Sequence, residues 1–359
     1  MTLREKVGQM FYVRPECLDT TIHIWGSGGV DATVAELARI KLQAVNATMR
    51  AVNEKYPVGG IILYAHNIDD EAQLARFIPQ LRSLKGSPLL CIDEEGGRVA
   101  RIANNGNFHV EKFESMGAIG ATGDPRNAYR CGNTIGTYLS TYGFDIDFAP
   151  VADVNTNPEN IVIGARAFSD NPTVAASMVT SYLNGLKDAG ITGCIKHFPG
   201  HGDTKADTHY GYAQSLKTWE EMMTCEMVTF RAGIDWGCQL IMTAHIGTPN
   251  VTGSDIPATM SPLILQDKLR GVLGYQNVIV TDAMEMGAIT QQYSSAEAAI
   301  GTLQAGADIV LGPQNFIEAF DAVVKAVENG TISEQRINQS VRRILKLKEQ
   351  ARKKLTIDN

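Results

Sequence analysis

TGCIKHFPGHGDTKADTHYG, residues 192–211, decides the fold because it places reactive side chains directly after an apolar run. The run, TGCIKHF, has the length and composition of a buried strand. Lys196 and His197 lie at its C-terminal end. Proline and glycines follow at once and prevent regular structure, so residues 198–211 are predicted to form a long exposed loop. Polar side chains at the C-terminal end of a strand, followed by a loop, are typical of α/β barrels.

Apolar runs of the same kind recur along the whole chain, each followed by a longer amphipathic or polar stretch. The eight runs are GQMFYV (8–13), GGIILYA (59–65), PLLCIDEE (88–95), FDIDFAPVADV (144–154), TGCIKHF (192–198), QLIMTAHI (239–246), NVIVTDAM (277–284) and ADIVLG (307–312). Near-continuous apolar strands separated by helices indicate a parallel sheet covered on both faces. The pattern predicts an α/β fold, a (β/α)8 TIM barrel, with residues 1–359 as a single domain. A doubly wound sheet is the alternative, but no GxGxxG motif follows the first strand.

Helical patterns lie between these runs. Three of them cover residues 35–56, 172–190 and 295–307, and the last two reach a glycine where a helix C-terminus expects one. A basic run near the end of the chain, RRILKLKEQARKKL (342–355), is interpreted as cations that complement the C-terminus of a helix.

Composition narrows the function classes. With 44% hydrophobic and 20% charged residues, the chain is typical of a globular protein, and no apolar run reaches the ~18 residues of a membrane span. The N-terminus has charges where a signal peptide would be apolar, so a cytoplasmic protein is expected, or a secreted one if a leader was removed. The net charge of −7 disfavours nucleic acid as a partner. The six scattered cysteines are expected to be free, buried thiols.

Polar side chains gather where the predicted strands end, on the face where barrel enzymes build their sites. They are Asp93, Glu94, Asp153, Lys196, His197, His245 and Asp282. Asp282 is a candidate nucleophile on a rigid strand, although a carboxylate there could instead cap the next helix. In CIDEEGGRVAR (91–101), two glycines allow a sharp turn, and an aspartate and arginines could bind ligand hydroxyls or simply pair with each other.

The loop after Lys196 and His197 carries a candidate acid/base pair. Asp207 and His209 are separated by one residue, so an extended segment would point both side chains to one side. The carboxylate could then fix the imidazole tautomer, although such residues also cap turns. A metal site is the rival interpretation of this histidine-rich loop. Zinc motifs, however, usually set two ligands one helical turn apart, so we expect no metal and no organic cofactor.

An acid/base group, a separate carboxylate and several hydroxyl-binding groups on one face suit cleavage of a glycosidic bond. The stretches KHFPGHGDTKADTHYG, VTDAMEMG, DEEGGRVAR and GARAFSDNP resemble glycoside hydrolase family 3, specifically its single-domain bacterial β-N-acetylglucosaminidases of the peptidoglycan-recycling type. The resemblance runs from about residue 3 through the eighth predicted strand.

The resemblance implies a role for each matching position. Asp282 would be the nucleophile that forms a covalent glycosyl intermediate, and His209 the acid/base polarised by Asp207. The positions that match the sugar-binding residues of the family are Asp93, Arg101, Arg166, Lys196 and His197. The expected protein is a retaining exo-acting enzyme with a carbohydrate substrate, an N-acetylglucosaminyl oligosaccharide or muropeptide.

This sequence departs from the family at three positions. Glu94 stands where glutamine is common, Thr208 where serine is common, and Ala167 where serine often follows the arginine. Four other interpretations stay open: a β-glycoside phosphorylase, a family 3 β-glucosidase, a metal-dependent hydrolase and a sugar-binding protein without activity.

Overall fold

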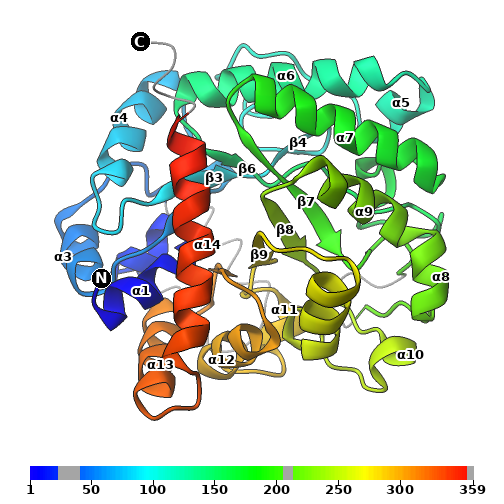
Figure 1. Cartoon of the computed structure of the whole chain (residues 1–359). Helices are drawn as coiled ribbons and strands as arrows, with labels where there is room; N and C mark the ends of the chain where they lie inside the picture. Colours follow the sequence, from blue (N-terminus) through cyan, green and yellow to red (C-terminus); the bar gives the residue numbers. More distant parts are fainter. Residues whose placement is uncertain (23–40, 205–212, 354–359) are drawn as a thin grey trace.

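Eight parallel strands form a closed barrel at the centre of the molecule (Figure 1). The computed structural model describes residues 1–22, 41–204 and 213–353. The strands are β1 (Phe11–Val13), β2 (Gly60–Leu63), β3 (Leu89–Ile92), β6 (Ile146–Asp147), β7 (Thr192–Phe198), β8 (Leu240–Thr243), β9 (Val278–Thr281) and β10 (Val310–Leu311). They pair in the order β10-β1-β2-β3-β6-β7-β8-β9, and a parallel bridge between Val280 and Ile309 closes the ring. Each strand lies within a predicted run, so the predicted TIM barrel is confirmed.

Helices form a ring around the strands (Figure 1). The α-helices are α1 (Leu3–Gln9), α3 (Ala47–Lys55), α4 (Glu71–Arg82), α5 (Met116–Ala121), α6 (Pro125–Tyr142), α7 (Pro172–Asp188), α8 (Trp219–Thr224), α9 (Glu226–Trp236), α10 (Pro249–Thr252), α11 (Gly287–Thr290), α12 (Ser295–Ala305), α13 (Phe316–Glu328) and α14 (Glu334–Lys353). A π-helical segment, η5 (Leu263–Val272), and short 3₁₀ turns, η1 (Pro15–Leu18), η2 (Ala65–Asn67), η3 (Gly164–Arg166) and η4 (Ala258–Met260), complete the connections. As predicted, α12 ends at a left-handed glycine, Gly306, with a φ of 118°.

The strands of the barrel are buried on both faces. All four residues of β2, β3, β8 and β9 are buried. On the outer side, Phe11 packs against Phe316 and Phe320 of α13, with ring centroids 5.6 and 5.8 Å apart. Burial on both faces explains why the sequence shows continuous apolar runs instead of alternation.

One predicted helix is shorter than expected. The pattern over residues 35–56 forms a helix only from Ala47, where Asn46 caps the N-terminus through a 2.9 Å hydrogen bond from the Met49 N–H. Directly before this cap, the Val45 N–H donates to the Gln80 side chain at 2.9 Å. A side chain of α4 thus takes the backbone bond that a helix would have made.

The basic run near the C-terminus agrees with its interpretation only in part. α14 continues to Lys353, so Arg352 and Lys353 lie in its last turn, whereas Arg342, Arg343 and Lys346 lie in the middle of the helix. In Figure 1 this helix passes in front of the strands. The Lys348 ammonium donates to the carbonyls of Gly86 and Ser87, just before β3, at 2.8 and 2.9 Å. α14 therefore covers N-terminal ends of strands, on the side of the barrel away from the predicted site.

A short antiparallel hairpin follows β3. It consists of β4 (Glu94–Gly96) and β5 (Val99–Ala100), and its turn uses Gly96 and Gly97 with φ of 86° and 67°. The predicted sharp turn is confirmed, because left-handed φ values favour glycine.

Two further expectations concern the chain as a whole. All six cysteines are free thiols; four are buried, whereas Cys17 and Cys225 are partly exposed. Within residues 1–22, 41–204 and 213–353, no helix combines the length and the apolar character that crossing a membrane requires.

Candidate active site

Lys196 lies at the centre of an ionic network where β7 meets the ends of β3 and β4. Its ammonium nitrogen is 2.9 Å from Asp93 Oδ1 and 2.6 Å from Glu95 Oε1. Burial would lower the pKa of Lys196, but these two carboxylates raise it above its usual value. The side chain is only 3% exposed, so the site contains a fixed, permanently charged cation.

Glu95 joins this cation to Arg166. Arg166 donates through Nε and Nη2 to the two oxygens of Glu95, at 2.8 and 2.7 Å, in a bidentate pair. Burial would raise the pKa of Glu95, but Arg166 and Lys196 hold it far below its usual value. Glu95 is therefore an ionised anchor that positions two cations. It was not among the predicted site residues, although it stands in the same acidic triplet as Asp93.

His197 has a defined orientation. Its Nδ1 lies 2.7 Å from Asp153 Oδ2, and its Nε2 lies 3.3 Å from Nη2 of Arg166. Because a guanidinium only donates, Nε2 acts as the acceptor and Nδ1 carries the proton that Asp153 accepts. Burial would raise the pKa of Asp153, but the interactions with His197 and His201 together lower it below its usual value. Asp153 thus stays ionised and fixes the imidazole tautomer.

Asp282 follows β9 directly and is partly buried. Its N–H donates to the carbonyl of Thr243 at 3.0 Å, and its Oδ1 accepts the Ala283 N–H at 2.7 Å. Burial would raise the pKa of Asp282, but His197 and then His245 lower it, and the net shift is downward. The side chain is therefore a carboxylate at neutral pH, the form that a nucleophile requires.

His245, another predicted strand-end residue, supports the turn after Asp282. Its Nε2 lies 3.0 Å from the Ala283 carbonyl and its Nδ1 lies 2.9 Å from Oγ1 of Thr259. A carbonyl can only accept, so Nε2 carries a proton that it donates to Ala283, while Nδ1 lies beside the Thr259 hydroxyl, which itself donates to the Ala244 carbonyl at 2.9 Å. Both ring nitrogens are used by protein groups, which assigns His245 to positioning the loop.

Asp93 and Arg101 form the more open edge of the site. Their side chains are 16% and 28% exposed, and Nη2 of Arg101 lies 3.4 Å from Asp93 Oδ2. The Arg101 guanidinium also lies 5.9 Å from the ring centre of Tyr64. Arg98, in contrast, donates to backbone carbonyls of Ile161 and Val162 and holds the loop after β6.

Glu94 does not belong to the site, which corrects its placement among the strand-end residues. Its side chain turns away from Asp93, is fully buried, and accepts backbone N–H groups of Ile102 and Ala103 at 2.9 and 2.8 Å. It also accepts the Tyr138 hydroxyl at 2.8 Å. The glutamate therefore stabilises the hairpin and its following loop, and its charge does not face a ligand.

The predicted exposed loop is buried where the structure describes it. His201 and Thr204 are 3% and 1% exposed. The Asn160 side-chain amide donates to the His201 carbonyl at 2.8 Å, because the loop after β6 folds over this segment. On the other side of residues 205–212, the Ser215 hydroxyl donates to Asp203 at 3.1 Å. Asp207 and His209 fall within 205–212 and lie outside the described residues.

The structure thus brings together five predicted residues through direct contacts or shared partners. They are Asp93, Arg101, Arg166, Lys196 and His197. Asp282 follows β9 at the same strand-end side of the barrel, close enough to His197 and Lys196 for both to lower its pKa. A further ion pair, between the buried Arg14 and the partly buried Glu285, is not among the predicted site residues. Its signal in the sequence was only that both residues follow apolar runs.

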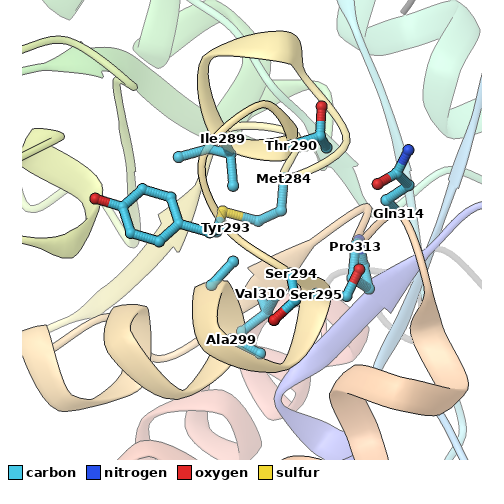
Figure 2. Close-up of a pocket in the computed structure, with 11 residues that line it drawn as sticks. Met284, Ile289, Thr290, Tyr293, Ser294, Ser295, Ala299, Val310, Pro313 and Gln314 are labelled. Atoms are coloured by element: carbon cyan, nitrogen blue, oxygen red, sulfur yellow. The ribbon is translucent and has the colours of Figure 1, made fainter. Parts of the chain in front are cut away.

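Two further features limit what the surroundings can hold. A cavity beside the loop after β9, lined by Met284, Ile289 and Tyr293 among others, has a volume of about 10 Å³ (Figure 2). This is room for about one water molecule, so the cavity is no ligand site. Among the residues that the structure describes, no group of three or more His, Cys, Asp or Glu is placed to hold a metal ion.

Fold and site define a class of protein: a TIM barrel whose strand ends present an ionised aspartate, an oriented imidazole and clustered cations. The chain belongs to glycosyl hydrolase family 3, since the family model described as the N terminal domain of that family matches residues 2–347. The resemblance inferred from the sequence is therefore confirmed.

Individual relatives agree with this assignment. Beta-hexosaminidase A of Pseudoalteromonas piscicida is 35% identical over 323 residues, which cover 82% of this chain and 54% of the relative. Beta-hexosaminidase of Stenotrophomonas maltophilia (strain R551-3) is 34% identical over 273 residues, 74% of this chain and 80% of the relative. The solved family 3 β-N-acetylglucosaminidase from Paenibacillus sp. str. FPU-7 superposes with a TM-score of 0.87 at 34% identity, covering 98% of this chain and 63% of that one. The chain thus spans about half the length of the first of these relatives.

Proposed function

We propose that the protein is a retaining, exo-acting β-N-acetylglucosaminidase in which residues 1–359 act as one barrel domain. The observation that carries the proposal is the ionised Asp282 directly after β9, on the same strand-end side of the barrel as Lys196 and His197, which both lower its pKa. The names of the relatives, two beta-hexosaminidases and a β-N-acetylglucosaminidase, support the choice of sugar.

In the proposed reaction, Asp282 attacks the anomeric carbon while the bond to the leaving oxygen breaks. His209, polarised by Asp207, donates its proton to that oxygen. A covalent glycosyl ester results, and His209 then takes a proton from water, which attacks the same carbon and releases Asp282. Two displacements at one carbon retain the β configuration.

The buried cations would bind the terminal sugar. Asp93 and Arg101, which are partly exposed, would bond hydroxyl groups at the open edge of the site. Lys196 and Arg166, fixed by Glu95, would donate from the floor, and His197 would accept through Nε2. Since these donors are already positioned, little ordering cost remains when the sugar binds.

The natural substrate is proposed to be an N-acetylglucosaminyl oligosaccharide such as a muropeptide, with no metal or organic cofactor. A phosphorylase is the second candidate, because a neutral imidazole acid/base repels an attacking phosphate less than a carboxylate would. Initial rates measured with and without inorganic phosphate, followed by product analysis for glycosyl phosphate, separate the two.

The main test is a panel of aryl β-glycosides. The N-acetylglucosaminide should be cleaved fastest, ahead of the glucoside and the xyloside, and NMR should show the β anomer of N-acetylglucosamine first. Release of the α anomer, or preference for the glucoside, contradicts the proposal. Activity that survives metal removal by EDTA is also expected, and a loss restored by a metal would favour the metal-dependent hydrolase.

The nucleophile is tested by Asp282→Asn. Turnover should fall to background, because the amide is not a nucleophile of comparable strength. Asp235→Asn, on the exposed end of α9, removes the same charge and should leave turnover unchanged. Substantial turnover by Asp282→Asn would exclude Asp282 from this role.

The acid/base is tested by His209→Ala. A substrate whose leaving group needs no protonation should lose much less in its first step than a natural disaccharide. Equal losses for both substrates would argue against His209 as the general acid.

A further inference from the structure

A second cavity lies at the other pole of the barrel. It has a volume of about 240 Å³ and opens where β8 and β9 begin, beneath the middle of α14. Val278, the first residue of β9, lines it, whereas Asp282 follows the opposite end of the same strand. The cavity is therefore separate from the candidate active site.

The lining of this cavity is polar and basic. None of its lining residues is acidic. The polar side chains are the cations Arg342, Arg343 and Lys346 and the amides Gln239, Gln276 and Asn277. In a chain whose net charge is −7, three cations around one hollow form a local exception.

The positive charge is not balanced by the buried carboxylate beneath. Asp308 is that carboxylate, and it is shared by three guanidiniums. Arg270 and Arg343 approach it at 2.7 and 3.0 Å, and Arg336 at 3.7 Å. One negative charge cannot compensate three positive ones, so a net positive potential reaches the cavity above.

Two of the lining cations have no protein partner in the part of the chain that the structure describes. Arg342 and Lys346 are exposed, make no hydrogen bond or ion pair there, and stand four residues apart on one face of α14. Arg343 between them is held rigidly, since its Nε donates to the Gln276 carbonyl at 3.1 Å and its Nη1 binds Asp308. One cation is thus preorganised, and two are available to a ligand.

We propose that this cavity binds the phosphate group of a small phosphorylated molecule, such as a sugar phosphate. Arginine forks match the geometry of phosphate oxygens, and lysine adds a point charge. The amides of Gln239 and Gln276 offer donors and acceptors for hydroxyl groups beside the phosphate. The volume is just below the range of about 300 to 1,000 Å³ typical for drug-sized ligands, which fits a compact organic phosphate. The acidic net charge disfavours long polyanions such as nucleic acid.

The test measures binding of glucose 6-phosphate, inorganic phosphate and sulfate to the full chain by isothermal titration calorimetry at constant ionic strength. Arg342→Gln/Lys346→Gln removes the two available cations. The matched control is Arg231→Gln/Lys325→Gln, which removes two exposed cations from α9 and α13 that likewise have no ion-pair partner among the described residues. Circular dichroism and turnover of an aryl β-N-acetylglucosaminide confirm that both variants are folded.

We expect one saturable site for glucose 6-phosphate in the wild type and in the control variant. The Arg342→Gln/Lys346→Gln variant should bind at least about tenfold more weakly, which corresponds to about 1.4 kcal/mol. Absence of saturable binding by the wild type would overturn the proposal. So would equal weakening in both variants, unchanged binding in Arg342→Gln/Lys346→Gln, or sulfate binding as tightly as the phosphate ester.

Discussion

Glu95 and Arg166 face each other across the floor of the candidate site and share two hydrogen bonds of 2.7 and 2.8 Å. Glu95 also contacts Lys196 at 2.6 Å, so one buried carboxylate pairs with two buried cations, and Asp93 gives Lys196 a second negative partner at 2.9 Å. The site depends on this charge balance, because an unpaired charge in such surroundings is costly.

Glu95→Gln should therefore impair both stability and substrate binding. The substitution keeps the shape of the side chain but removes one negative charge that Lys196 and Arg166 share. We therefore expect the free energy of unfolding to fall by about 3 kcal/mol. KM should rise because the two cations lose their fixed positions. Urea unfolding and steady-state kinetics measure the two effects.

A matched control is Glu111→Gln. Glu111 pairs with Arg130 on the surface, with side chains 42% and 61% exposed, so its loss should cost less than about 1 kcal/mol. If the two variants were equally stable, the network around Glu95 would not have the importance assigned to it.

Asp153→Asn tests how His197 is positioned. The amide of asparagine can donate to Nδ1, which would move the ring proton to Nε2 and place it against the donor Nη2 of Arg166. Losses of about 10- to 100-fold are common when such orienting partners are removed, and we expect kcat/KM to fall within that range.

The decisive readout for Asp153 is the tautomer itself. The ¹⁵N shifts of the His197 ring should report a proton on Nδ1 in the wild type and a change in Asp153→Asn. A variant that loses activity while the ring keeps its Nδ1 proton would show that Asp153 acts only through packing.

The barrel could be predicted because its signals are local. An apolar run such as TGCIKHF is buried on both faces in any parallel barrel, and β7 occupies that run without an extra or missing residue. The end of a strand also determines where a side chain is placed, and Lys196, His197 and Asp282 lie where the predicted strand ends indicated.

The acidic triplet after β3 shows what could not be predicted. Asp93, Glu94 and Glu95 are consecutive, yet they contact Lys196, the backbone of the following loop and Arg166, respectively. The β4 and β5 hairpin decides these directions, and its geometry depends on packing against distant segments. Sequence reasoning therefore found Asp93, misplaced Glu94 and missed Glu95.

His201 should make stability depend on pH in mildly acidic solution. Burial lowers the pKa of this imidazole from 6.5 to about 4. In the unfolded chain the ring takes up a proton below pH 6.5, whereas the folded chain does not until about pH 4. The free energy of unfolding is therefore unaffected by His201 above pH 6.5 and decreases as the pH falls from 6.5 to 4. Near pH 5 this decrease is about 2 kcal/mol.

The measurement compares urea midpoints between pH 7 and pH 4.5. His201→Gln lacks the titrating ring and should show a smaller fall in stability over this range. His109→Gln, which replaces an exposed histidine, should behave like the wild type. Parallel curves for the wild type and His201→Gln would refute the role of this histidine.

Gly202 is required by close approach and not by its backbone conformation. An added Cβ would lie 2.0 Å from the Val154 carbonyl oxygen and 2.6 Å from its carbon, far inside contact distance. Gly202→Ala must therefore push residues 201–204 away from the loop after β6, at a cost of about 2 kcal/mol or more. Since Asp153 accepts a hydrogen bond from the His201 N–H at 2.6 Å, the displacement should also disturb His197 and lower kcat/KM.

Gly106→Ala is the matched control, because nothing lies within 4 Å of its added Cβ. Equal thermal unfolding temperatures and equal kcat/KM in the two variants would contradict the claim that residues 201–204 require glycine at position 202.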